Sequence, residues 1–170
     1  MTMIKDILKS KGKPKEKQVQ LVEAVCNDKI NAEEFIEFFT SASDVDKGTC
    51  ADAMKHISKQ KPEILAPFID TLVEYIDYKA SRVKWGIPEA IGNMAEKYPY
   101  KAEKAIPKLL LNTKDKSTVV RWCAAYALSE TAKYNQKRQK ELISIFTKNA
   151  KEEKNNGVKN IYLKTLKKLQ

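Results

Sequence analysis

One histidine and two tryptophans are the residues of this chain best suited to chemistry or to ligand recognition. His56 is the sole histidine, and no serine, cysteine or carboxylate pattern around it forms a nucleophile-and-base arrangement. Trp85 is followed one helical turn later by Glu89, which would place an aromatic ring beside a carboxylate. No group of His, Cys and acidic residues has metal-ligand spacing, and neither GxGxxG nor GxxxxGK[ST] occurs. The sequence therefore predicts no catalytic residue, no metal and no cofactor.

The two tryptophans lie in a segment that repeats along the chain. Residues 83–91 (VKWGIPEAI) match residues 120–128 (VRWCAAYAL) at an offset of 37 residues, and looser copies cover 49–57 and 158–166. In the two clear copies the apolar residues recur with the 3.6-residue period of a helix that buries one face. Apolar helical patterns precede the copies, at 35–39, 64–76, 105–111 and 142–146. One helix pair cannot bury its apolar stripe alone, so we expect these pairs to stack in series.

The beginning of the chain has a different character. Residues 16–27 predict one leading helix, whereas residues 9–17 are rich in lysine and contain Gly12 and Pro14. We expect residues 1–170 to form a single domain whose Lys-rich segment 1–17 is partly mobile.

The repeated residues resemble the HEAT-repeat family of armadillo-like helical repeat proteins. The second helix of that family typically carries an acid, Val-Arg, small residues and Ala-Leu, which Asp115 and residues 120–128 match. Its first helix often holds a proline in an apolar stretch, as at 65–68 (LAPF) and 105–108 (AIPK). The resemblance is clear over 60–134 and weaker toward both ends. It implies an all-α, right-handed superhelical solenoid of about four HEAT-like helix pairs plus a leading helix.

The resemblance also implies a scaffold or adaptor that is not an enzyme and that binds a protein or peptide on its concave face. On a helical wheel, Trp122 and Tyr126 point away from the core of their own helix pair. Aligning the copies predicts a binding site of aromatic residues flanked by charges: Trp85, Glu89, Trp122, Tyr126, Lys55 and Lys164. The alternative for the two tryptophans is packing between repeats, because tryptophan is seldom fully exposed.

Two other residues receive structural interpretations from the same alignment. His56 takes the position of small residues on the packed face of later copies and is predicted to be partly buried. On the helical wheel Arg121 lies at about 100° from Val120, beside Leu128 and Ala132, and flanks the core. In the family, the matching arginine pairs with acids in the loop before it. The alternative is a basic ladder for phosphates, formed by Arg121 with Lys84 and Lys159.

The formal charge of +10 is unevenly placed, at −7 over residues 21–77 and +13 over residues 78–170. The basic half favours a second function, a nucleic-acid-binding protein that follows phosphates. A third is a relative of the HEAT-like DNA glycosylases, in which Trp85 with Glu89 would imitate the concave aromatic and its nearby carboxylate.

Cysteine usage and hydropathy bear on the location of the protein. The three cysteines, Cys26, Cys50 and Cys123, are far apart and odd in number, which predicts free thiols in a reducing compartment. No apolar run has the length of a membrane span or the form of a signal peptide. We therefore expect a cytoplasmic monomer with no membrane partner.

Overall fold

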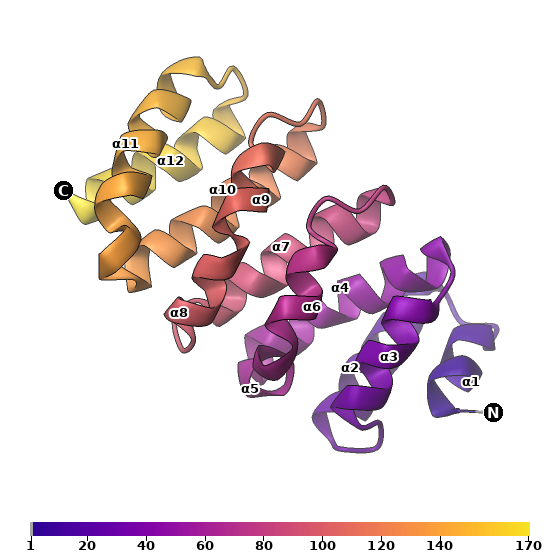
Figure 1. Cartoon of the computed structure of the whole chain (residues 1–170). Helices are drawn as coiled ribbons and strands as arrows, with labels where there is room; N and C mark the ends of the chain where they lie inside the picture. Colours follow the sequence, from indigo (N-terminus) through magenta and orange to yellow (C-terminus); the bar gives the residue numbers. More distant parts are fainter. Residues whose placement is uncertain (1) are drawn as a thin grey trace.

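The computed structural model describes residues 2–170 as stacked helix pairs, with no β-strand in this range. The helices form two layers, with α3, α6, α9 and α11 in front and α4, α7, α10 and α12 behind (Figure 1). The two termini lie at opposite ends of the row. The predicted all-α solenoid of stacked helix pairs is therefore confirmed.

Each pair consists of a first helix and a second helix. The first helices are α1 (Met3–Lys9), α3 (Ala32–Ser41), α5 (Pro62–Leu65) with α6 (Ile69–Glu74), α8 (Pro99–Ala102) with α9 (Ile106–Asn112), and α11 (Gln136–Glu152). The second helices are α2 (Pro14–Cys26), α4 (Asp44–Gln60), α7 (Ser81–Met94), α10 (Thr118–Tyr134) and α12 (Asn156–Leu169). The second helices pack against one another in chain order, α2 on α4, α4 on α7, α7 on α10 and α10 on α12.

The leading helix predicted over 16–27 is α2, and it has a first helix of its own. Ile4 and Leu8 of α1 are buried, and Lys17 Nζ donates a hydrogen bond to the carbonyl of Leu8 at 2.7 Å. These contacts attach α1 to the first turn of α2. The partial mobility of segment 1–17 stays a prediction, and Met1 lies outside the described residues.

Prolines divide the first helices of the two central pairs. Pro67 lies in the 3-10 turn η1 (Ala66–Phe68), and Pro107 follows a second such turn, η2 (Glu103–Ala105). Proline has no N–H to donate and its ring clashes with the preceding turn, so the helix breaks there. Pro88 is different, because α7 continues through it. Its buried ring is held by the packing of α7 between α4 and α10.

Side-chain caps set where several second helices begin. Ser43, Ser117 and Asn155 each accept a hydrogen bond from the backbone N–H three residues later. Such a cap satisfies a donor that the first turn leaves free and stabilises the helix by about 1 kcal/mol. The caps place α4, α10 and α12 in equivalent starting positions.

The buried residues of α4 and α7 correspond at an offset of 37 residues, the same offset that relates the copies at 83–91 and 120–128. The buried residues of α4, namely Cys50, Ala53, Met54 and Ile57, correspond to Ile87, Ala90, Ile91 and Met94 of α7. In this register His56 matches Asn93 and is exposed, so the prediction that His56 is partly buried is wrong. The weak first copy has no tryptophan to mark its place, and the sequence alignment slipped by three residues. A slip of three turns a helix by about 60°, enough to exchange a packed position for an exposed one.

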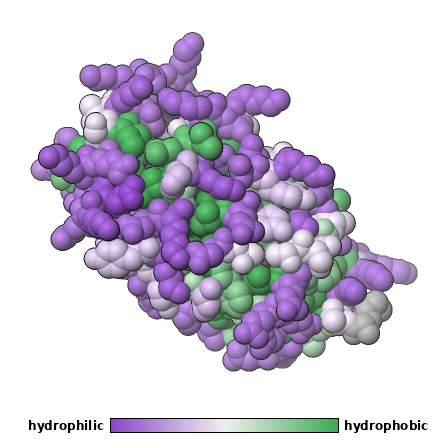
Figure 2. All heavy atoms as spheres, viewed as in Figure 1, coloured by the Kyte–Doolittle hydropathy of each residue, from purple (hydrophilic) through white to green (hydrophobic). Residues whose placement is uncertain are grey.

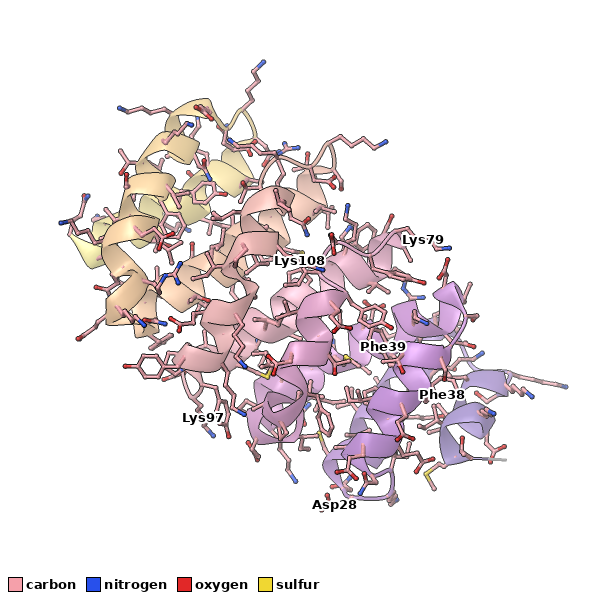
Figure 3. The ribbon with its side chains drawn as sticks, in the orientation of Figure 1. Asp28, Phe38, Phe39, Lys79, Lys97 and Lys108 are labelled. Carbon is pink, nitrogen blue, oxygen red and sulfur yellow. The ribbon has the colours of Figure 1, made fainter. Side chains whose placement is uncertain are left out.

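Polar contacts between neighbouring first helices repeat at similar spacing. Lys108 of α9 reaches back to the end of α6 (Figure 3), where Nζ lies 2.9 Å from Asp77 Oδ1 and 3.2 Å from the carbonyl oxygen of Glu74. Asn112 donates a buried hydrogen bond to the carbonyl of Ile76 at 2.9 Å. Hydrophilic side chains cover most of the face that the first helices form (Figure 2).

All three cysteines are buried free thiols, as predicted. Burial raises the pKa of Cys50 and of Cys123 to about 12, and it raises the pKa of Cys26 as well.

Only the thiolate is an effective nucleophile, so we expect no thiol to react rapidly with a disulfide reagent near pH 8 in the native protein. All three should react after unfolding in guanidinium. One thiol that titrates immediately in the native state would contradict this expectation. The cytoplasmic location stays a prediction.

Candidate functional site

A pair of stacked aromatic rings lies on α10, with Trp122 exposed and Tyr126 half-buried. The rings of Trp122 and Tyr126 are 5.7 Å apart between centroids and 8° from parallel, and Trp122 remains 38% exposed. Both residues lie on what we call the second-helix face, the surface of α4, α7, α10 and α12 that points away from the first helices. Trp122 and Tyr126, together called the aromatic pair, thus combine a large contact area with a fixed geometry.

Asn93 of α7 holds the aromatic pair in place. The hydroxyl of Tyr126 donates to Asn93 Oδ1 at 2.5 Å, and Asn93 Nδ2 donates to the carbonyl of Lys55 at 3.0 Å and to Ser58 Oγ at 3.1 Å. One amide therefore connects α10, α7 and α4. Burial first, and then the charges of Glu130 and Glu89, raise the pKa of Tyr126 to about 12, so its hydroxyl keeps its proton at neutral pH.

A glycine on α7 makes room for the tyrosine ring. An added Cβ at Gly92 would lie 2.8 Å from Tyr126 Cε1 and 3.0 Å from the Cα of Ala127. The ring of Tyr126 therefore rests on the backbone of the neighbouring helix. Neither Gly92 nor Asn93 was among the site residues predicted from the sequence. A glycine inside a helical pattern is itself a signal of close approach, because it destabilises an isolated helix by up to about 1 kcal/mol.

Two charged residues of the predicted site, Lys55 and Glu89, lie together and are paired with each other. Lys55 Nζ lies 3.5 Å from Asp52 Oδ1 and 3.9 Å from Glu89 Oε2. Arg82 Nη2 of α7 binds Asp52 Oδ2 at 2.6 Å. The matched register also puts Asp52, and not Lys55, in the row of Glu89 and Tyr126. Ion pairs as exposed as these contribute at most about 1 kcal/mol each, so a ligand could rearrange them at small cost.

The remaining predicted residues differ in their surroundings. Trp85 is half-buried, and its Nε1 is buried with no hydrogen-bond partner among residues 2–170. It therefore packs more deeply than Trp122. Lys164 of α12 is exposed, in the same row as Tyr126. The structure thus brings Trp122, Tyr126 and Glu89 onto one face and leaves Trp85 partly inside it.

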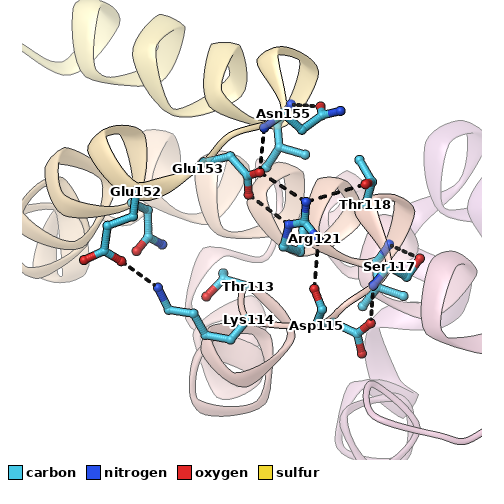
Figure 4. A network of polar contacts seen from close by, with 12 residues as sticks. Thr113, Lys114, Asp115, Ser117, Thr118, Arg121, Glu152, Glu153 and Asn155 are labelled. Carbon is cyan, nitrogen blue, oxygen red and sulfur yellow. Dashed lines mark hydrogen bonds and ion pairs between the residues drawn. The ribbon is translucent and has the colours of Figure 1, made fainter.

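Arg121 belongs to a structural network at the loops, shown in Figure 4. Its Nε lies 2.9 Å from Glu153 Oε2, and its Nη1 donates to the carbonyls of Asp115 and Lys116 at 3.0 and 3.2 Å. The side chain of Glu153 is only 8% exposed. The preceding loop therefore supplies carbonyl oxygens, whereas the acid comes from the loop of the following pair, which corrects the partner predicted for this arginine.

The same arrangement occurs one repeat earlier. Lys84 Nζ binds Asp115 Oδ2 at 2.7 Å, and Asp115 Oδ1 also accepts the backbone N–H of Ser117. Glu153 likewise accepts the N–H of Asn155. Each acid thus orders the loop before one second helix and binds a cation on the preceding second helix. This pairing supports the structural interpretation of Lys84 and Arg121 over a ladder for phosphates.

Known protein structures match this chain in fold. A designed armadillo repeat protein aligns with 98% of this chain and 81% of its own, with a TM-score of 0.75 at 16% sequence identity. The chain has an armadillo-like helical repeat fold. A second designed armadillo repeat protein, solved in complex with peptide (KR)4, aligns with 98% of this chain and 85% of its own, with a TM-score of 0.72 at 15% identity. No protein-family model and no curated protein sequence matches the chain.

Hydropathy adds one finding about the armadillo-like solenoid. In residues 2–170, every helix falls short of the length and apolar character needed to cross a lipid bilayer.

Proposed function

We propose that this armadillo-like chain is a non-enzymatic adaptor that binds an extended protein segment or peptide across its second-helix face. In a solenoid this face is the concave one, which presents equivalent positions of successive helices to a long ligand. A designed protein of the same fold was solved in complex with a peptide, (KR)4, which supports a peptide as the ligand. The observation that carries the proposal is the aromatic pair, exposed at Trp122 and anchored through Asn93.

The anchoring matters for affinity. A side chain that must be ordered on binding costs about 0.5–1.5 kcal/mol, and here the rings are ordered beforehand by stacking and by the hydrogen bond of Tyr126. Tryptophan and tyrosine dominate binding energy at protein interfaces for this reason and for their area. The pair is therefore suited to contact an aromatic or aliphatic side chain of the partner.

Removing the exposed ring should weaken binding with little effect on folding. We expect Trp122→Ala to lower the affinity for a bound peptide by about 2 kcal/mol, because a central aromatic contact is lost. The melting temperature should change little, since much of this side chain already faces solvent. Peptides for the measurement would be selected from a random displayed library on the wild-type protein, and their affinities measured by isothermal titration calorimetry.

A matched control is available on the first-helix side. Tyr100 of α8 is 68% exposed, so Tyr100→Ala removes an aromatic ring that is more accessible than Trp122 and lies outside the proposed site. The selected peptides should bind this variant as they bind the wild type. The proposal is wrong if the selected peptides bind Trp122→Ala as tightly as the wild type.

A further inference from the structure

The lysines of α12 differ from the cations of the two preceding second helices, α7 and α10. In α7 and α10, every Lys and Arg lies in an ion pair: Arg82, Lys84, Arg121 and Lys133. Helix α12 contains four lysines and no acid, and none of the four has an acidic partner within residues 2–170. Three of them, Lys164, Lys167 and Lys168, are exposed. These cations are available to a partner.

Their placement puts them beside the aromatic pair. Helix α12 packs against α10, and its buried residues Val158, Tyr162 and Leu166 match Val120, Ala124 and Leu128 at an offset of 38 residues. In this register Lys164 lies in the row of Tyr126, and Lys167 in the next row along the same face. A chain that crosses from α10 to α12 would therefore leave the aromatic rings and meet two lysines.

The surrounding charge reinforces this preference. Residues 136–169 contain ten Lys and Arg and three Glu, a net charge of +7. The α7 side of the aromatic pair is not basic, since Glu89 lies there and is paired with Lys55. Glu130 follows Tyr126 by one turn on α10 and is paired with Lys133. The second-helix face thus changes from mixed charge at α7 to purely positive at α12. A charge pattern of this kind selects and orients a partner through its own charges.

We infer that the partner is an acidic peptide segment whose carboxylates lie over α12 while an aromatic or apolar residue contacts Trp122. This inference rests on the proposed function and adds the chemistry of the ligand and the placement of its charges relative to the anchor. Packed helices are about 8–10 Å apart, and an extended chain advances about 3.3 Å per residue. The carboxylates therefore follow or precede the apolar anchor by about three residues.

A nucleic acid fits this face less well. Single strands also combine base stacking with lysine contacts, so the aromatic pair and α12 alone would suit one. A strand crossing the whole face, however, would bring phosphates next to Asp52, Glu89 and Glu130. A peptide can place its charges on one side of the anchor only. The acidic peptide is therefore the ligand that matches both halves of the face.

The test uses three fluorescein-labelled peptides that differ in two positions. Each has a tryptophan anchor in a Gly/Ser background, with Glu-Glu, Gln-Gln or Lys-Lys beginning three residues beyond it. Fluorescence anisotropy at about 50 mM salt should show the Glu-Glu peptide bound about tenfold more tightly than the Gln-Gln peptide. The Lys-Lys peptide should bind least. The double variant Lys164→Gln/Lys167→Gln should bind the Glu-Glu peptide about tenfold more weakly than the wild type does. Its affinity for the Gln-Gln peptide should not change.

A control variant separates local contact from overall charge. Lys148→Gln/Lys151→Gln makes the same charge change on α11, where both lysines are exposed. We expect it to change the affinity for Glu-Glu less than about twofold. An equal loss in the two double variants would mean that net charge alone attracts the peptide, and would overturn the contact with α12.

Other outcomes distinguish this inference from the proposed function. Suppose that Trp122→Ala lowers the affinity for all three peptides, but the wild-type protein binds the Glu-Glu and Gln-Gln peptides equally tightly. The adaptor proposal then stands, and the proposed acidic ligand is wrong. No binding of Glu-Glu up to about 100 µM also overturns the acidic ligand. A labelled oligothymidylate that binds more tightly than Glu-Glu, and requires both Trp122 and Lys164, would replace it with single-stranded nucleic acid.

Discussion

Arg121→Ala should lower the free energy of unfolding by about 3 kcal/mol. The substitution leaves the carboxylate of Glu153, 8% exposed, without the guanidinium that binds it through two nitrogens. It also removes donors from the carbonyls of Asp115 and Lys116, which order the loop before α10. Urea unfolding followed by circular dichroism measures the loss. The folded variant should bind peptide as the wild type does, because the side chain of Arg121 contacts the loop before α10 and Glu153, about 100° around the helix from that of Trp122.

A matched control removes an arginine from an exposed ion pair. Arg138 binds Glu141 one turn away on α11, at 2.8 Å, and the carboxylate is 49% exposed. Arg138→Ala should cost about 0.5 kcal/mol or less, since exposed pairs contribute little. Equal losses in the two variants would show that the burial of Glu153 does not matter.

The dependence on pH provides a second check of the same pair. Burial alone would raise the pKa of Glu153, but the hydrogen bonds from Arg121 and from backbone N–H groups outweigh it, and the pKa lies below the ordinary value of 4.5. The unfolded state then binds the proton more readily, so this group's contribution is present above pH 4.5 and is lost as the pH falls through the folded pKa.

In Arg121→Ala the sign reverses. The buried carboxylate loses its cation, its folded pKa rises, and protonation favours the folded state. The stability difference between wild type and variant should therefore shrink between neutral pH and about pH 4. A difference that stays constant over this range would exclude an unpaired carboxylate as the cause. The double variant Arg121→Ala/Glu153→Gln should be more stable at neutral pH than Arg121→Ala alone.

Gly86→Leu should destabilise the protein by a similar amount, about 3 kcal/mol, through a different cause. An added Cβ at Gly86 would lie 2.7 Å from the carbonyl oxygen of Ala51, 2.8 Å from its carbonyl carbon and 2.9 Å from its Cβ. Backbone atoms inside α4 cannot turn aside, so the larger residue must push α4 and α7 apart. That separation would loosen the buried contacts along both helices.

Gly48→Leu is the matched control on the facing helix. There an added Cβ would meet the side chain of Arg82, at 3.1 Å from its Cβ and 3.2 Å from its Cδ. The Cβ of Arg82 must shift by a few tenths of an ångström, and the flexible end of the side chain can move outward at the cost of its ion pair with Asp52, about 1 kcal/mol. In thermal unfolding, Gly86→Leu should therefore have a clearly lower melting temperature than Gly48→Leu. A Gly86→Leu protein as stable as Gly48→Leu would mean that the α4–α7 contact adapts easily.

The sequence by itself determined the class of fold and the face that α10 exposes. The clear copies at 83–91 and 120–128 share apolar residues at helical spacing, and this spacing alone implies paired helices that must stack. A wheel drawn on one helix was also enough to predict that Trp122 points outward and that Arg121 flanks the core. Both depend on angles within a single helix, which its geometry sets whatever its neighbours are.

Only the tertiary structure decided what lies across from each of these faces. It set the register of α4 against α7, the exposure of His56, the depth of Trp85, and Glu153 as the partner of Arg121. It also revealed Asn93, whose amide gains its role from contacts with two other helices. These features depend on how closely the helices approach, which small residues such as Gly86 and Gly92 permit. Distances between helices arise from packing many side chains together, and no periodicity within one helix contains them.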